Sequence, residues 1–335
     1  MPHPNEEIQE KACLALRELT INYFPVGENG PSDRLQKRLV DKYLSSVSES
    51  ENPACTRGFA LAFGYLPAKL LAPCTDVLDS IICCLCRISH FDAKVGTEKD
   101  AETRRNALIA LRQVISTVGI EADLRGGVNR GNISGMNAKQ VSCVFDAFFA
   151  GLEDYNVDRR GDVGSWCRIE AMKGLETIAY LVVEQTTEAS LPLLLDSSMA
   201  SRMIGSLLKQ LSEKLDNARV EAGSCLHRIL TKQDPAIPFI PEKDYLEECF
   251  SPHDANQNMN WSDASVTFPM VAKAATVDIY FSPIIAGMVI SVGGLTESVA
   301  KQSCASLLQL VKQAKGSKRI SELGNSESFV SFLGF

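Results

Sequence analysis

The hydrophobic positions of this chain recur at helical spacing. Apolar residues repeat every three or four positions in segments of roughly 12 to 20 residues, and short polar breaks separate the segments. Alternating β-branched runs, which would indicate strands, do not recur. The pattern predicts an all-α protein with helices near residues 6–24, 33–48, 54–65, 74–90, 98–118, 137–152, 163–184, 199–215, 217–231, 264–281, 283–292 and 296–314.

A weak internal repeat runs through these helices. It consists of a basic or polar residue, a small residue three positions later and usually Leu four positions after that. The clear copies are Arg104-x-x-Ala107-x-x-x-Leu111, Arg168-x-x-Ala171-x-x-x-Leu175 and Arg219-x-x-Ala222-x-x-x-Leu226, and the weaker ones are Gln9-x-x-Ala12-x-x-x-Leu16, Arg57-x-x-Ala60-x-x-x-Gly64 and Lys301-x-x-Cys304-x-x-x-Leu308. Their separation is close to the roughly 40–47 residues of HEAT and armadillo repeats, except across two longer gaps.

The spacing of the repeat has a physical reason, because positions three and seven apart share one face of a helix. The small residue lets the paired helix approach, and the Leu fills the core between the two helices. We expect the basic residue at the edge, bonded to an acidic group or to helix carbonyls of the preceding repeat. Each pair leaves one apolar side open, so the pairs must stack. We therefore predict a single HEAT/armadillo-type α-solenoid over residues 1–335, with about six stacked antiparallel helix pairs.

Insertions explain the two longer gaps. The first lies near residues 119–136 and is rich in glycine, and the second lies near residues 232–262 and is rich in proline. Loops of this length in a compact array are either mobile or functional. We expect at least one of them to be functional.

Composition narrows the class of protein. The chain has 335 residues, of which 45% are hydrophobic, and 41 acidic against 34 basic residues give a net charge of −7. No cluster of Lys and Arg suited to nucleic acid is present. The most apolar stretch, residues 284–295, is broken by glycines and shorter than the roughly 20 residues that span a bilayer. The 11 cysteines and a polar N-terminus without a signal-peptide pattern indicate a reduced, cytosolic chain.

A glycine-rich segment has the spacing of a phosphate-binding loop. It runs from Gly126 to Asn132, but Asn132 stands where the loop needs Lys, and Ile133 where it needs Ser or Thr. No strand is predicted before it. We interpret the segment as a loop that does not bind nucleotide.

A possible zinc site lies on the helix at 74–90. Cys83, Cys86 and His90 share one face, opposite an apolar stripe of Leu78, Ile81, Leu85 and Ile88. A tetrahedral site needs a fourth ligand, which is not evident nearby. No motif of a hydrolase, metalloprotease or kinase is present in the sequence. We expect no catalytic residue, metal or cofactor.

The most unusual stretch of the chain reads Asp-Arg-Arg-Gly-Asp-Val-Gly-Ser-Trp-Cys-Arg and leads into a repeat helix. Asp162 is placed to cap that helix. Trp166 lies in the first turns, where it can pack on the neighbouring repeat, and Arg168 follows Asp162 at the spacing of an Asp–Arg ladder between repeats. Arg159 and Arg160 precede the helix, so we expect them to be exposed and available to an acidic partner.

This stretch, together with the following Glu170-Ala171-Met172, resembles the C-terminal region of tubulin-specific chaperone D, also called tubulin-folding cofactor D. Cys167 departs from the pattern, because the family usually has an aliphatic residue there. A looser resemblance covers residues 100–108. Members of the family are much longer and carry further helical repeats.

The resemblance implies a non-catalytic protein-binding scaffold. The family binds β-tubulin and, with cofactors C and E and an Arf-like small GTPase, assembles and disassembles the αβ-tubulin dimer and supports GTPase activation on tubulin. It also implies a cytoplasmic protein associated with the microtubule cytoskeleton. Since tubulin is acidic, Arg125, Arg130, Arg159 and Arg160 are candidate contacts. The alternative is a generic HEAT-repeat adaptor for another cytosolic complex.

Overall fold

The computed structural model describes residues 3–23, 26–27, 30–31, 33–72, 75–90, 100–121, 135–251, 259–294 and 296–313. These residues form fourteen α-helices, one 3₁₀ turn and two hairpins of two-residue strands. The predicted all-α fold of adjacent helix pairs is confirmed. The chain divides into two compact units, Met1–Asp196 and Ser197–Phe335. That residues 1–335 form one array of about six repeats stays a prediction.

The first unit contains eight α-helices within its described residues. They are α1 (Glu6–Tyr23), α2 (Asp33–Ser48), α3 (Pro53–Phe63), α4 (Ala68–Leu71), α5 (Thr75–Ser89), α6 (Ala101–Val118), α7 (Ala138–Leu152) and α8 (Gly164–Gln185). The hairpin strands are β1 (Val26–Gly27), β2 (Gly30–Pro31), β3 (Val157–Asp158) and β4 (Gly161–Asp162), and the 3₁₀ turn is Leu191–Leu193.

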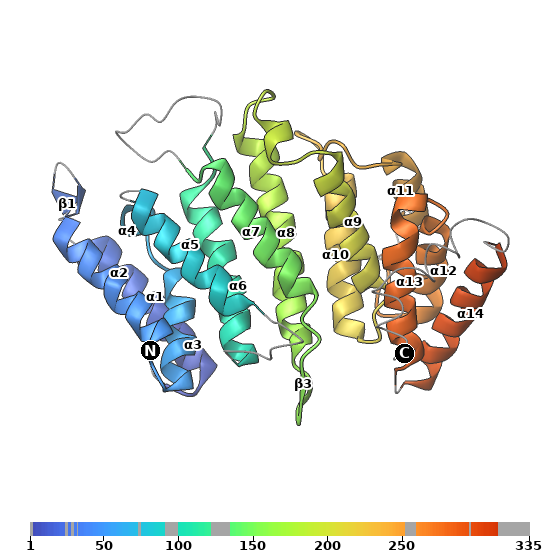
Figure 1. Ribbon diagram of the computed structural model, residues 1–335, viewed down its shortest axis with the longest axis horizontal. Coiled ribbons are helices and arrows are strands. Elements are labelled where there is room, and N and C mark those ends of the chain that lie inside the picture. Colours follow the sequence, from blue (N-terminus) through green and yellow to red (C-terminus); the bar gives the residue numbers. More distant parts are fainter. Residues whose placement is uncertain are drawn as a thin grey trace. The chain divides into compact units, whose positions relative to one another are not determined.

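Two layers of helices make up the first unit (Figure 1). One layer contains α1, α3, α6 and α8 in that order, and the other contains α2, α5 and α7. Across the layers, α2 packs on α3, α5 on α6 and α7 on α8. The core lies between the layers and includes Leu108, Phe145 and Leu175, all fully buried. Each pair buries its apolar faces against its partner and its neighbours, as in a helical-repeat protein.

The second unit is built from α9 (Ser197–Leu211), α10 (Asp216–Thr231), α11 (Lys243–Phe250), α12 (Ala264–Ala274), α13 (Asp278–Val292) and α14 (Glu297–Gln313). Helix α9 packs on α10 and α13, and α14 packs on α12 and α13. The short helix α11 contacts α10 and α12, so the insertion predicted near 232–262 is partly helical.

Short polar side chains fix where several helices begin. Asn52, Asp100 and Asp263 each accept a backbone N–H from the first turn of α3, α6 and α12 respectively. Asn137 and Gln140 form a capping box at the start of α7, with reciprocal bonds of 3.0 and 2.9 Å. These bonds satisfy N–H groups that lack an intrahelical partner.

The three clear copies of the repeat lie in the core, with each basic, small and Leu position at most 1% exposed. The basic residues were expected at the edge, so their complete burial corrects that prediction. One of the weaker copies, Lys301-x-x-Cys304-x-x-x-Leu308, is wrong, because Leu308 is 59% exposed and does not fill the core. Helix α14 instead buries Ser303, Ser306 and Leu310.

A boundary in the second unit also differs from the prediction. The break between the helices predicted at 264–281 and 283–292 lies at residues 275–277, and Pro283 lies inside α13. Proline removes one helical hydrogen bond but does not always end a helix. Its ring is accommodated against α9, where a Cβ on Gly205 would lie 3.2 Å from its Cγ.

We predict that Gly174→Ala destabilises the protein, although alanine normally favours a helix. A Cβ at this position of α8 would lie 2.2 Å from a ring carbon of Phe148 in α7, so the helices would have to separate. Overpacking of this kind costs about 1–3 kcal/mol of unfolding free energy, measurable by urea titration. The control Gly293→Ala meets its nearest atom at 3.7 Å and should be near neutral. An unchanged Gly174→Ala midpoint would contradict this packing.

Candidate functional site

The connection between α7 and α8 is a short β-hairpin that carries the sequence stretch singled out above. Asp158 in β3 pairs with Gly161 in β4, which leaves Arg159 and Arg160 as the two turn residues. Gly161 has a φ of +104°, a conformation that residues with a Cβ rarely adopt. In Figure 1 the hairpin projects past the neighbouring helix ends of the first unit. The turn therefore holds two arginines at the edge of the layer.

Asp162 and Arg168 bond each other at the start of α8. Asp162 Oδ1 accepts the backbone N–H of Ser165 at 3.1 Å, in the first turn of α8. The guanidinium of Arg168 donates to both carboxylate oxygens of Asp162, at 3.1 and 3.0 Å. It also lies 4.3 Å from the centre of the Tyr155 ring. The Asp162–Arg168 pair lies within one repeat, so it does not form the expected ladder between repeats.

The bond between repeats is made by another acidic residue, Asp154, which follows α7. Its carboxylate accepts Nε and Nη2 of Arg104 from α6, at 2.8 and 3.1 Å, and both side chains are about 1% exposed. Its backbone carbonyl accepts Nη1 of Arg168 at 2.6 Å. A Cβ on Gly164 would lie 2.2 Å from that carbonyl oxygen, which explains the glycine. Asp154 thus joins two successive repeat helices, α6 and α8.

A comparable buried arginine occurs in the second unit. Arg219 of α10 donates Nη1 to the carbonyl of Glu213 at 2.7 Å and Nη2 to the carbonyl of Ser262, which lies just before α12. It also forms an ion pair with Asp216. One guanidinium therefore connects the start of α10 with the segment that leads into α12.

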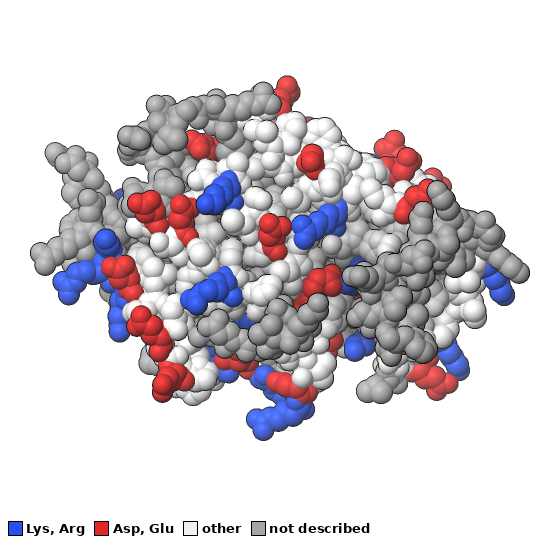
Figure 2. All heavy atoms as spheres, in the orientation of Figure 1, with Lys and Arg blue, Asp and Glu red and all other residues white. Residues whose placement is uncertain are grey.

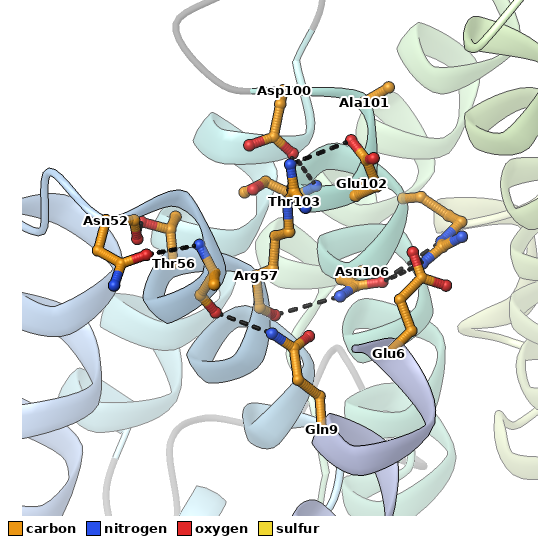
Figure 3. A network of polar contacts seen from close by, with 12 residues as sticks. Glu6, Gln9, Asn52, Thr56, Arg57, Asp100, Ala101, Glu102, Thr103 and Asn106 are labelled. Atoms are coloured by element: carbon orange, nitrogen blue, oxygen red, sulfur yellow. Dashed lines mark hydrogen bonds and ion pairs between the residues drawn. The ribbon is translucent and has the colours of Figure 1, made fainter. Parts of the chain in front are cut away.

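Polar bonds between repeat helices also occur near the start of the first unit (Figure 3). Arg57 of α3 donates Nε to Asp100 at 3.1 Å, and its Nη2 lies 3.5 Å from a carboxylate oxygen of Glu102. The Nδ2 of Asn106 donates to the carbonyl of Arg57 at 3.2 Å. Gln9 of α1 donates to a carbonyl of α3 at 2.9 Å. Polar side chains thus link α1, α3 and α6.

These bonds run in the direction opposite to the prediction. Gln9, Arg57 and Arg104 each reach the following repeat, whereas contact with the preceding repeat was expected. All three lie in the first turns of their helices, where side chains lean toward the N-terminal end. For Gln9 and Arg57 the acceptors lie at the start of the next repeat helix, and for Arg104 the acceptor is Asp154, between α7 and α8.

Arg160 does not stand free at the turn, although 42% of its side chain is exposed. It forms an ion pair with Glu102 of α6 and donates Nη2 to Asp158 at 2.7 Å. Its guanidinium and backbone N–H both bond Asp158, and this lowers the pKa of the Asp158 carboxyl below its usual value. Arg160 therefore fastens the hairpin to α6.

Glu102 receives two arginines, Arg57 from one side and Arg160 from the other. Burial by itself would raise the pKa of this carboxyl, but the hydrogen bond from Arg160, a backbone bond and the charge of Arg57 outweigh it. The net effect lowers the pKa. Glu102 is therefore held as a carboxylate, at the point where α3, α6 and the hairpin meet.

Trp166 is half-buried in the first turn of α8. The guanidinium carbons of Arg160 and Arg105 lie 5.0 and 5.9 Å from its ring centre, within reach of a cation–π interaction. Arg105 belongs to α6 and is itself paired with Glu6 of α1, at 3.0 Å. The indole thus contacts the neighbouring repeat, as expected for this position.

Arg159 is exposed at the tip of the hairpin. Among the described residues, its side chain makes no hydrogen bond or ion pair, so its charge faces solvent. Arg125 and Arg130, the other basic candidates, lie outside the described residues. A partner role for Arg159, Arg160, Asp162, Trp166 and Arg168 stays a prediction.

We call the connected side chains at the starts of α1, α3, α6 and α8 the helix-start cluster: Glu6, Arg57, Asp100, Glu102, Arg105, Asp158, Arg160 and Trp166. Its three arginines and four carboxylates are paired with one another through ion pairs. On the face in Figure 2, both signs of charge are likewise interspersed, including at the lower edge below α8. The cluster therefore links successive repeats, and Arg159 at the tip of the hairpin adds one positive charge that faces solvent.

Sequence reasoning missed Asp154 and Glu102, the two most important acceptors. Each is distant in the chain from its arginine, at 50 residues for Arg104–Asp154 and 58 for Glu102–Arg160. Neither belongs to the repeated pattern. The sequence does carry a signal for acidic partners near the repeat arginines: an aspartate stands shortly before the basic residue in each clear copy, at Asp100, Asp162 and Asp216.

The other candidate sites gain no support. Leu78, Ile81, Leu85 and Ile88 are buried as predicted; Cys83 is exposed on α5, and His90 is exposed just after its end. Within the described ranges, no group of three or more His, Cys, Asp or Glu is placed to hold a metal ion. The glycine-rich segment from Gly126 lies outside the described residues. No helix in the described part is both long and apolar enough to cross a membrane.

The fold and the site define a helical-repeat protein whose repeats are joined by buried arginine–acid bonds. Residues 201–330 match the family described as tubulin folding cofactor D C terminal. Tubulin-specific chaperone D from Dictyostelium discoideum is 26% identical over 347 residues, covering 98% of this chain and 23% of the relative. These two findings confirm the predicted resemblance to the C-terminal region of tubulin folding cofactor D. The chain spans less than a quarter of that relative's length.

A solved structure of an engineered protein also matches, at 14% identity and a TM-score of 0.39. The match covers 82% of this chain and 98% of the engineered protein.

We predict that Asp154→Ala strongly destabilises the protein, because it leaves the buried charge of Arg104 without its carboxylate. Removing one partner of a buried ion pair costs about 3–5 kcal/mol. The matched control is Asp158→Ala, which removes an exposed carboxylate four residues later in the chain. It should lower the thermal midpoint much less than Asp154→Ala does. Equal midpoints for the two variants would argue against Asp154 as the link between α6 and α8.

The lowered pKa of Glu102 predicts a specific pH dependence. A carboxyl whose pKa is lower in the folded state stabilises the protein above its unfolded pKa, and this stabilisation is lost as the pH falls through the folded pKa. The stability advantage of the wild type over Glu102→Gln should therefore be largest near pH 7 and shrink on acidification toward about pH 3. Urea titrations at several pH values measure it. A pH-independent difference would show that ionisation of Glu102 is unimportant.

Proposed function

We propose that this chain is a non-catalytic protein-binding scaffold that acts in tubulin folding. The observation that carries the proposal is the match to tubulin-specific chaperone D along 98% of the chain. The family match over residues 201–330 supports it independently of the hairpin stretch. The finer proposal is that the chain binds β-tubulin and takes part in assembling and disassembling the αβ-tubulin heterodimer.

Several further features of the proposal follow from the resemblance. The proposed partners are β-tubulin, tubulin cofactors E and C and an Arf-like small GTPase, and the chain would contribute to GTPase activation only within such an assembly. The proposed location is the cytoplasm, in association with the microtubule cytoskeleton. Nucleic acid is not a proposed partner, because the chain is acidic overall.

The architecture is suited to binding a folded protein. Layered helical repeats present long surfaces made of side chains from successive helices. In the first unit, the ion pairs of the helix-start cluster link α1, α3, α6 and the β3–β4 hairpin, so the surface is organised before a partner arrives. Preorganisation lowers the entropic cost of binding.

The proposed contact for an acidic partner is the tip of the β3–β4 hairpin. Arg159 is exposed there, while Arg160 is already paired with Glu102 and Asp158. An exposed charge outside an ion-pair network is best placed to steer an oppositely charged protein. Arg160 would act indirectly, by holding the turn in position.

The proposal is tested by pull-downs of the 335-residue chain. Purified αβ-tubulin, cofactor E and the small GTPase are each tested separately. Retention of tubulin is the expected result. Failure to retain any of the three would contradict a tubulin-folding role for this segment. In a parallel pull-down from a cytosolic extract, retention of only unrelated proteins would favour a generic adaptor.

We predict that Arg159→Glu weakens tubulin binding several-fold at low salt, mainly by slowing association, and that the difference shrinks as salt rises. Surface plasmon resonance at several ionic strengths measures both effects. The matched control is Lys139→Glu, the same charge change on an exposed residue in the first turn of α7. Because α7 has 15 residues, this control lies about 22 Å from the hairpin end of the helix. Equal loss in both variants would show that only net charge matters.

A further inference from the structure

The outer helices α5 and α7 of the first unit bring cysteines from two repeats together. These helices pack side by side (Figure 1). Cys83 and Cys143 are exposed, and Cys86 is partly buried. The thiol of Cys86 contacts the backbone carbonyl of Cys143, with Sγ and O 3.7 Å apart.

The geometry suits a bond between the two helices. The thiol of Cys86 touches the backbone of Cys143, so the two helices approach closely at this point. A disulfide needs Cβ atoms about 3.5–4.5 Å apart. Formation of the bond therefore requires new rotamers, which turn the two sulfur atoms toward each other, and a small adjustment of the two helix backbones. Cys83 is three residues from Cys86 on the same helix, so a bond between those two would constrain nothing across the repeats.

We propose that Cys86 and Cys143 form a site for thiol–disulfide exchange, at which a low-molecular-weight disulfide is reduced and a Cys86–Cys143 bond joins α5 to α7. The thiolate of exposed Cys143 attacks the small disulfide, forms a mixed disulfide and releases one small thiolate. The thiolate of Cys86 then attacks the sulfur of Cys143 and releases the second. Two protein thiols lose their protons and two electrons, and two small thiols are produced.

The environment of Cys86 sets the speed of the second step. Burial raises the pKa of its thiol to about 12, and Cys143 and Asp146 from α7 and Cys83 and Cys84 from α5 add to the effect. Only the thiolate is a nucleophile, so closure is slow near neutral pH and accelerates as the pH rises. The mixed disulfide at Cys143 therefore accumulates at pH 7 and converts to the cross-link in alkaline solution.

The test uses the full chain with oxidised glutathione, followed by non-reducing peptide mass mapping. At pH 7 we expect a glutathione adduct on Cys143, and transfer to pH 9 should increase the rate of cross-linking by up to about a hundredfold. Cys86→Ser should stop at the adduct on Cys143, and Cys143→Ser should form no cross-link. Cys83→Ser, the matched control on the same helix, should leave the cross-link unchanged.

Three results would overturn the proposal: a Cys83–Cys86 bond in place of the inter-helix bond, adducts distributed equally over Cys55, Cys143 and Cys304, or no cross-link at either pH. Circular dichroism of each variant before oxidation establishes that it is folded. Because Cys143 and Cys83 are both exposed, their serine variants keep the proposal testable even where Cys86→Ser fails to fold.

Discussion

The stacking of the first unit depends on guanidinium groups that are buried together with their acceptors. Apolar helix faces attract one another in many relative positions, since hydrophobic burial has no preferred direction. A buried arginine has little such freedom, because losing its carboxylate costs about 3–5 kcal/mol. Arg104 and Arg168 both bond Asp154, one through its carboxylate and the other through its carbonyl. This one residue fixes how far α8 lies along α6.

The hairpin is part of the same arrangement. It begins just after Asp154 and ends at Asp162, and each of these acids holds a buried arginine. Arg160 ties the turn to Glu102 of α6, so the hairpin is anchored at both ends and at its turn. The hairpin, which projects past the neighbouring helix ends of the first unit, is consequently held by the bonds that align them. A partner that contacts Arg159 would meet a fixed element of the scaffold.

The sequence predicted most of what depends on periodicity and little of what depends on distant partners. Helix positions and the three clear copies follow from apolar spacing, which acts over a few residues, but the burial of Arg104, Arg168 and Arg219 does not. Asp154 and Glu102 could not be found in this way, because their arginines lie 50 and 58 residues away. The copy ending at Leu308 failed for a related reason: a spacing match does not say which face of the helix meets its neighbours.

The residues that carry the family resemblance are largely explained by folding. Gly161 permits the turn, Asp162 accepts an N–H of the first turn of α8, and Gly164 allows close approach to Asp154. Arg168 bonds the carboxylate of Asp162 and the backbone carbonyl of Asp154. A stretch with so many structural roles would be retained for the architecture alone, whatever the scaffold binds. The resemblance in this stretch therefore speaks first for the shared fold. The proposed role in tubulin folding depends more on the match along 98% of the chain, and Arg159 is the residue of the stretch whose exposure no folding role explains.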